Sequence, residues 1–128
     1  MKDKYILDSS IWIELERKTA SVCAKIVPLI QKNEICLVDV IVAEVLRGTK
    51  TNKDFQMLEK AFQNFRWLTT HWQKVARLAF EVAQGGHHPP LIDLYIAQCA
   101  IENKKIVVTQ DKHFIHIAQV ASLKHILL

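Results

Sequence analysis

The sequence predicts an α/β fold in which helices flank a central, mainly parallel sheet of about four to five strands. Three short apolar runs, at residues 4–8, 35–38 and 106–109, are rich in β-prone side chains. Segments with helical apolar spacing separate these runs, and this alternation is typical of parallel strands joined by right-handed crossovers. In such folds, functional residues lie beyond the carboxyl ends of the strands.

The first strand is expected at residues 4–8, where a β-prone run ends in an acid. A helix follows it, and we predict that a serine of the Ser9-Ser10 pair caps this helix. The next helix is expected over residues 21–32, where Pro28 either kinks the helix or marks its start.

The second strand, at residues 35–38, leads directly into another helix. Asp39 is its predicted N-cap, and Gly48 is expected to end it. Glu44 then lies on the second turn of this helix.

The following segment carries an amphipathic helix that forms a hairpin with the preceding one. Its apolar stripe, which suits either the core or a partner surface, consists of Phe55, Leu58, Phe62 and Phe65. A capping box formed by Thr70 and Gln73 predicts one more helix, which ends at Gly85-Gly86.

The last part of the chain is expected to contain two helices and two strands. Pro90 suits the first turn of a helix in which Asp93 lies near the start, with the small Ala97 one turn further on. The strand at 106–109 follows, and then a final helix at 114–120 and a strand at 125–128.

Size and composition favour a soluble, globular protein with a single domain over residues 1–128. Acids interrupt the apolar stretch near the N-terminus, which argues against a signal peptide or a membrane span and favours a cytoplasmic location. The three cysteines form no CxxC pair, so we expect them to be reduced core residues.

The net charge of +4 comes from 17 Lys and Arg against 13 Asp and Glu. Without the four acids discussed next, the balance is 17 against 9, which is a surplus of +8. A protein whose acidic cluster is neutralised by a cation would therefore present a basic surface to a polyanion such as a nucleic acid.

Four acids stand at or near the ends of the apolar runs, or one turn into the helices that follow: Asp8, Glu44, Asp93 and Asp111. If they converge in space, each pair about 4 Å apart costs on the order of 4 kcal/mol at an effective dielectric of about 20. Some acids must then take up protons, or a cation must bind. An all-oxygen site favours Mg²⁺ or Mn²⁺ over Zn²⁺. Such an ion activates water for attack on a phosphodiester, and no histidine base is needed.

Each acid alone also has a purely structural interpretation. Asp39 shows this interpretation best and receives no catalytic role, because an acid at a helix start is usually a cap. Asp93 equally suits the helix dipole. Glu44 and Asp8 lie in apolar surroundings, where an unpaired charge is costly. The four acids together favour a functional site.

Other polar residues are weaker candidates. The histidines His87, His88, His113 and His116 have no partners at zinc spacing and are interpreted as surface residues. A run of charged residues is usually only a solvated face of the protein. The basic residues that can still contact phosphates are Arg47, Lys50 and Lys112. Ser9, Ser10 and Thr109 lack a nucleophile's partners, so their hydroxyls are expected to hydrogen-bond a carboxylate or a metal-bound water.

Three segments carry a family resemblance: ILDSSIWIEL, VAEVLRG and PLIDLYIAQCAIENKKIVVTQDKHF. They resemble the PIN domain, and specifically the small ribonuclease toxins of the VapBC type. The resemblance runs from the first strand almost to the C-terminus. Its most specific part extends from Asp93 through Ala97 to Thr109, Asp111 and Phe114.

The resemblance implies a PIN-like three-layer fold and a Mg²⁺- or Mn²⁺-dependent endoribonuclease that inhibits translation and growth. It carries the catalytic acids onto Asp8, Glu44, Asp93 and Asp111. Of these, Asp8, Asp93 and Asp111 would hold the metal, and Glu44 would bind through water or accept a proton. Supporting hydroxyls would come from Ser9 and Thr109. It also implies a homodimer and a cognate VapB-type antitoxin, which would meet the toxin at the helical hairpin and cover the acidic groove.

The chain departs from the family pattern at one position. Many family members carry another acid two residues after the position of Asp111, whereas this chain has His113. One firmly held metal ion is therefore a better expectation than two.

Two other functions fit parts of the sequence. One is a PIN-type nuclease that processes RNA without an antitoxin, and the other is a non-catalytic module in which the acids hold a structural ion. A phosphoacceptor built on Asp8 fits poorly, because position 10 is Ser instead of a second acid.

Overall fold

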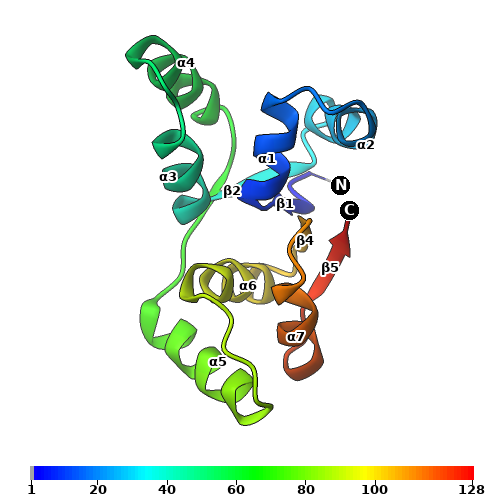
Figure 1. Ribbon diagram of the computed structural model, residues 1–128, viewed down its shortest axis with the longest axis vertical. Coiled ribbons are helices and arrows are strands. Elements are labelled where there is room, and N and C mark those ends of the chain that lie inside the picture. Colours follow the sequence, from blue (N-terminus) through cyan, green and yellow to red (C-terminus); the bar gives the residue numbers. More distant parts are fainter. Residues whose placement is uncertain (1) are drawn as a thin grey trace.

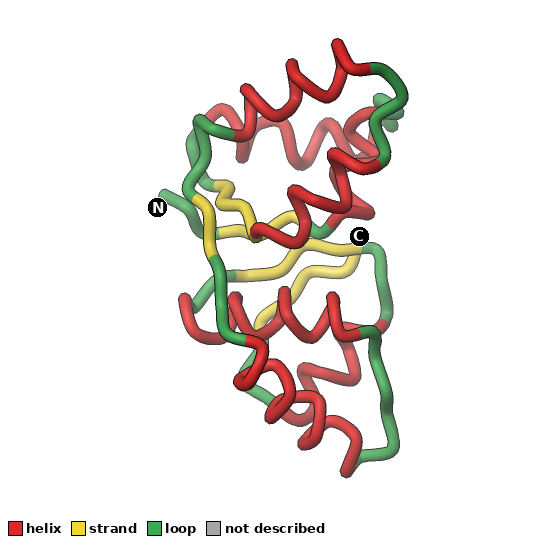
Figure 2. The backbone as a smooth tube through the Cα atoms, turned by 90° about the vertical axis from the view of Figure 1, so that its left-hand side faces the viewer, coloured by secondary structure: helices red, strands yellow, loops and turns green. Residues whose placement is uncertain are grey.

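The computed structural model describes residues 2–128 and has three layers, with a sheet between two groups of helices (Figure 1). In this range the chain forms five strands and seven helices. In chain order they are β1 (Tyr5–Leu7), α1 (Ser9–Glu16), α2 (Ala20–Gln31), β2 (Ile35–Val38), α3 (Asp39–Arg47), α4 (Asn52–Phe62), β3 (Trp67–Leu68), α5 (Trp72–Gln84), α6 (Leu91–Asn103), β4 (Ile106–Thr109), α7 (His113–Val120) and β5 (Lys124–Leu127). Figure 2 shows helices above and below the strands, as the predicted α/β class requires.

The strands follow the order β3-β2-β1-β4-β5, and each adjacent pair is parallel. Leu7 of β1 pairs with Val108 of β4, so Asp8 and Thr109 follow next to each other. From β1 the chain continues to β2, whereas from β4 it continues to β5 on the other side. Connections that diverge in this way leave a crevice at the carboxyl ends of the two central strands.

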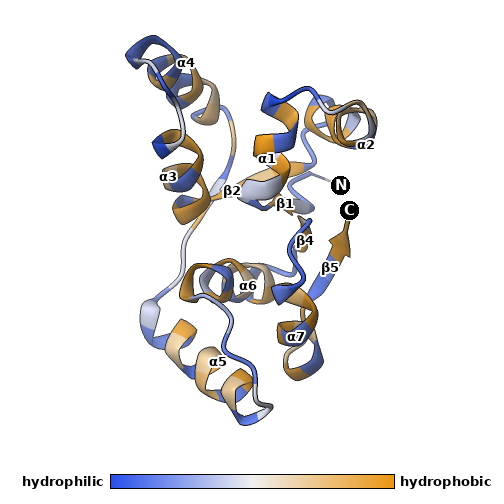
Figure 3. Cartoon of the chain, in the orientation of Figure 1, coloured by the Kyte–Doolittle hydropathy of each residue, from blue (hydrophilic) through white to orange (hydrophobic). Residues whose placement is uncertain are grey.

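Apolar composition explains the central strands. All residues of β2 are buried, as are Val107, Val108 and Thr109 of β4. Helices cover both faces of these strands, so a continuous apolar run is favoured over alternation. Helix α6 is buried around most of its circumference, and hydrophobic residues occupy most of its length in Figure 3. Strand β5 lies at the edge and is more exposed.

The apolar stripe predicted on the fourth helix, which is α4, mainly faces the core. Phe62 is buried and lies edge-on to Trp12, with ring centroids 5.2 Å apart. Phe55 and Leu58 pack against the same core. Phe65 was expected to continue the stripe. Helix α4 ends at Phe62, however, so Phe65 lies beyond the helix.

Two predicted N-caps are wrong by one residue. Asp8, not a serine, is the N-cap residue of α1, and its side chain makes no capping hydrogen bond. Asp39 is the first residue of α3, with Val38 as N-cap. Its carboxylate accepts hydrogen bonds from the Val40 amide at 2.9 Å and from the Tyr95 hydroxyl at 3.1 Å. It therefore joins α3 to α6 as well as serving the helix start.

The predicted capping box before α5 does not form, because the threonine side chain hydrogen-bonds a residue of another helix instead. The Thr70 hydroxyl donates to Glu102 Oε1 at 2.5 Å, and the Thr70 amide donates to the Tyr95 hydroxyl at 3.1 Å. His71 is the N-cap residue instead. Strand β3 was not expected, since two residues are too few to show a periodic pattern.

Pro28 lies inside α2, so it does not mark the start of this helix. Cys36 and Cys99 are buried as expected, and burial raises their thiol pKa to about 11 and about 12, respectively. Cys23 is only half-buried. Within residues 2–128, no helix combines the length and the apolar character that crossing a membrane requires.

Candidate active site

The four acids singled out in the sequence meet at the carboxyl ends of the two central strands. Asp8 directly follows β1, and Asp111 follows β4 by two residues. Glu44 comes from α3 and Asp93 from the first turn of α6. Burial is the main cause of the raised pKa of both Glu44 and Asp93, and the charge of Asp8 adds to each shift, so these carboxylates lie within electrostatic reach of one another.

Asp8 is only 4% exposed and is held by two hydroxyl groups. Thr109 Oγ1 donates to Asp8 Oδ2 at 2.9 Å, and Ser10 Oγ donates to the same oxygen at 3.2 Å. The two hydroxyls also accept hydrogen bonds from the loop after β4, from the Asp111 amide at 2.9 Å and the Gln110 amide at 3.1 Å. A single threonine hydroxyl therefore positions both Asp8 and the backbone of Asp111.

The substitution Thr109→Val tests this link, because it keeps the shape of the fully buried side chain and removes its hydroxyl. It removes one of the two hydroxyl donors to Asp8, with Ser10 remaining, and leaves the Asp111 amide without its acceptor. We expect the free energy of unfolding to fall by about 1 to 3 kcal/mol, measured by urea denaturation. Thr69→Val, at an exposed position, is the matched control and should change it by less than about 0.5 kcal/mol. Equal effects of the two substitutions would contradict this role of Thr109.

Asp93 and Asp111 enclose the ring of His113. His113 Nδ1 lies 2.8 Å from Asp93 Oδ2 and 3.0 Å from Asp111 Oδ1. Burial raises the pKa of Asp93, the hydrogen bond from His113 opposes this shift, and the charges of Asp111 and Asp8 add to it. The hydrogen bond to Asp93 raises the pKa of His113. His113 is thus exposed but not the plain surface histidine expected from the sequence.

Glu44 lies beside this group and not within the apolar stripe of α3. Val42 and Val45 are buried, whereas Glu44 is classed among the exposed residues. Even so, partial burial of its carboxylate raises its pKa, and the charges of Asp8 and Asp93 raise it further. A hydrogen bond from the Ser9 hydroxyl opposes the shift. A carboxylate with a raised pKa suits a group that accepts a proton.

The basic candidates are exposed. Arg47 and Lys50 border a hollow of about 360 Å³ between α3 and α4. Lys112 is the N-cap residue of α7 and directly follows Asp111. The rings of His87 and His116 stack on each other, with their centroids 3.8 Å apart.

The residues present fit a divalent cation. Asp93, Asp111 and His113 each offer a ligand atom, and these three atoms lie within 4.8 Å of one another. Among residues 2–128, this is the one group of at least three acids, histidines or cysteines with such spacing. Asp8 and Glu44 do not belong to it. Two neighbouring carboxylates gain most from a bound cation, because the cation removes their mutual repulsion.

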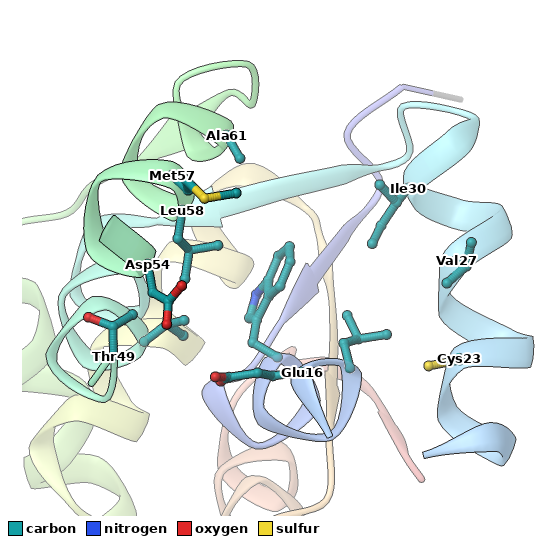
Figure 4. Close-up of a pocket in the computed structure, with 12 residues that line it drawn as sticks. Glu16, Cys23, Val27, Ile30, Thr49, Asp54, Met57, Leu58 and Ala61 are labelled. Carbon is teal, nitrogen blue, oxygen red and sulfur yellow. The ribbon is translucent and has the colours of Figure 1, made fainter. Parts of the chain in front are cut away.

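An apolar groove of about 550 Å³ lies between the helices on one side of the sheet (Figure 4). Met57, Leu58 and Ala61 of α4 form one wall, facing Val27 and Ile30 of α2 across the groove (Figure 4). Trp12 and Leu15 of α1 also line it, with the acids Glu16 and Asp54. The groove thus combines an apolar lining with two negative charges.

One residue of the site, His113, was not assigned to it from the sequence. The Ser10 hydroxyl was expected to hydrogen-bond a carboxylate or a metal-bound water, and the structure shows that the carboxylate is Asp8. His113 stands two residues after Asp111, and this spacing was the available signal. Its contact with Asp93 comes from the packing of α6 against α7.

The comparisons with known proteins concern the fold and the family of the chain. Three solved structures share the fold. VapBC2 from Rickettsia felis, bound to a DNA fragment from their promoter, is 20% identical, with 97% of this chain and 98% of that chain covered and a TM-score of 0.77. VapBC-1 from nontypeable Haemophilus influenzae is 18% identical, with 96% of each chain covered and a TM-score of 0.74. VapBC-5 from Mycobacterium tuberculosis, a member of the VapBC family of toxin-antitoxin systems, is 20% identical, with 98% of this chain and 99% of that chain covered and a TM-score of 0.66. No curated protein matches the chain. The family model of the PIN domain matches residues 5–120, and the chain therefore belongs to the PIN domain family.

Proposed function

We propose that this protein is a divalent-metal-dependent endoribonuclease and the VapC-type toxin of a type II toxin-antitoxin system. PIN domains are nucleases, so hydrolysis of a nucleic-acid backbone is the chemistry that this fold supports. The observation that carries the proposal is the convergence of four carboxylates at the carboxyl ends of β1 and β4. RNA as substrate is supported by the resemblance to VapBC toxins.

Asp93 and Asp111, with Asp8 beside them, would hold a Mg²⁺ or Mn²⁺ ion. When bound, the ion supplies a Lewis acid that orients water and stabilises charge on the phosphate oxygens. Glu44 has a raised pKa at the edge of this group and accepts the proton of the attacking water. Ser9, Ser10 and Thr109 hold the carboxylates in place.

The RNA backbone would be bound by exposed cations near the acids. Arg47 lies one helical turn beyond Glu44, and Lys50 follows it on the same hollow. Lys112 directly follows Asp111 at the start of α7. Contacts of this kind position the phosphates without reading the bases. Growth arrest would follow from the cleavage of RNA needed for translation.

The partner would be a VapB-type antitoxin, and the solved structures similar to this chain include VapBC2 and VapBC-1. Its binding segment would be an amphipathic helix whose apolar side chains fill the groove between α1, α2 and α4. Glu16 and Asp54 on this groove favour basic residues beside those anchors. Of the hairpin residues expected at this interface, Leu58 lines the groove, whereas Phe62 is buried in the core. We further propose that the toxin forms a homodimer.

Metal removal tests the proposal. Excess EDTA should abolish cleavage of an end-labelled RNA, and Mg²⁺ or Mn²⁺ added beyond the chelator should restore it. The ion also relieves repulsion among the carboxylates, so saturating ion at about 100 times its dissociation constant should raise the free energy of unfolding by about 2.7 kcal/mol. Undiminished cleavage in EDTA would contradict the proposal.

The identity of the products separates toxin from processing enzyme. Mapping new RNA ends in cells after induced expression should show cuts at few sites together with arrested growth. Co-expression of a neighbouring antitoxin gene should remove both effects. Precise trimming of one precursor RNA without growth arrest would favour the RNA-processing alternative.

A further inference from the structure

One nitrogen atom of His113 lies between the two carboxylates of the candidate metal group. Its Nδ1 is 2.8 Å from Asp93 Oδ2 and 3.0 Å from Asp111 Oδ1. The backbone amide of His113 also donates to Asp111 Oδ1, at 2.9 Å. One carboxylate oxygen thus holds both the main chain and the ring of His113. The ring is therefore oriented toward the position where the two acids converge.

The spacing of these atoms is that of neighbouring ligands around one ion. In an octahedron with bonds of about 2.0 to 2.1 Å, adjacent donors are about 2.8 to 3.0 Å apart. The two distances from His113 Nδ1 to the carboxylate oxygens are 2.8 and 3.0 Å. With its proton on Nε2, a neutral imidazole presents a lone pair at Nδ1.

We propose that His113 binds the divalent cation directly through Nδ1, together with Asp93 and Asp111, and makes this site select a first-row transition cation over Mg²⁺. The proposal rests on the proposed function, because the cation is the one that serves cleavage. Mg²⁺ prefers oxygen donors and loses its water reluctantly, whereas imidazole nitrogen is a good ligand for transition metals. A nitrogen ligand at this position therefore favours the binding of a transition cation over the binding of Mg²⁺.

Pulsed electron paramagnetic resonance of the Mn²⁺-loaded protein tests the bond itself. Wild-type protein should show the ¹⁴N coupling of a directly bound imidazole. His113→Gln should abolish this coupling, and the exposed loop variant His88→Gln should retain it. Absence of Mn²⁺ binding, absence of ¹⁴N coupling in the wild type, or coupling that survives in His113→Gln would overturn the proposal. Circular dichroism verifies folding, which is expected to persist because the His113 side chain is 46% exposed.

Calorimetric titration tests the selectivity. His113→Gln should weaken Mn²⁺ binding about 10-fold or more. Mg²⁺ binding should change less, so the ratio of the two affinities should fall. His113→Asp, which makes the donor set all-oxygen, should shift the ratio further toward Mg²⁺. An unchanged ratio in both variants would show that His113 acts only as a neighbouring charge, and would overturn the proposal.

The two proposals fail in different ways, because neither metal measurement requires RNA. A protein that binds Mn²⁺ through His113 but cleaves no RNA would refute the nuclease and keep the ligand. A protein that cleaves RNA in a metal-dependent way without ¹⁴N coupling would refute the ligand and keep the nuclease.

Discussion

The substitution Asp93→Asn is expected to reduce RNA cleavage by about 100-fold or more without lowering the melting temperature. Lewis-acid stabilisation by a bound ion is worth several kcal/mol, and each 1.4 kcal/mol is about a factor of ten in rate. Asp93 offers one of the three ligand atoms at metal spacing, so its loss should remove most of this stabilisation.

The unchanged or raised stability follows from the pKa of Asp93. Burial, opposed by the hydrogen bond from His113, raises this pKa above its value in the unfolded chain, and the charges of Asp111 and Asp8 add to the shift. A carboxyl group with a raised folded-state pKa stabilises the fold most at low pH. This contribution is lost as the pH rises from the unfolded pKa through the folded one. At neutral pH the ionised group therefore opposes folding, and a neutral amide removes this penalty.

Cleavage of a labelled RNA and thermal unfolding in EDTA measure the two effects. Glu59→Gln removes one negative charge from an exposed position on α4 and should leave both unchanged. Cleavage at the wild-type rate by Asp93→Asn would contradict the assigned role. A large fall in melting temperature would instead show that the pair with His113 outweighs the repulsion.

The second large effect is expected at the apolar groove. Met57→Glu places a charge on the wall that faces Val27 and Ile30. An antitoxin helix seated there would bury this charge without a partner, at a cost of several kcal/mol. We expect binding to weaken about 100-fold or more, so that the antitoxin no longer relieves growth arrest. Cleavage should persist, because Met57 is 62% exposed and lies outside the acid group.

Gln56→Glu is the matched control, since it adds the same charge to the neighbouring exposed position of α4, outside the groove lining. Growth under co-expression and the affinity of the purified pair measure the effect. Antitoxin that neutralises Met57→Glu as well as wild type would place the interface elsewhere. Loss of cleavage in Met57→Glu would mean that the substitution acts on the fold.

Local composition was sufficient to predict the main strands. Residues 35–38 and 106–109 are short apolar runs, and both are strands with the expected bounds. A strand buried on both faces needs a continuous apolar run, which is visible in any single sequence. Strand β3 pairs with β2 through two residues and left no such pattern.

Helix starts were less predictable, because a polar side chain there has several possible partners. Thr70 has the spacing of a capping box with Gln73, yet its hydroxyl donates to Glu102 on α6. Asp39 suits an N-cap, yet it also accepts a hydrogen bond from Tyr95. A local cap and a distant acceptor are worth similar free energies, so the packing of the helices decides between them.

The sequence by itself determined the class of fold and the position of the acids along it, because strand composition and strand ends are local properties. Only the tertiary structure decided how the site is completed. Asp93 is on α6, Asp111 follows β4 and His113 begins α7, so their contact depends on how two helices pack beside one strand. Local periodicity does not encode that packing. A histidine that resembles a surface residue in the sequence therefore lies between two carboxylates in the folded protein.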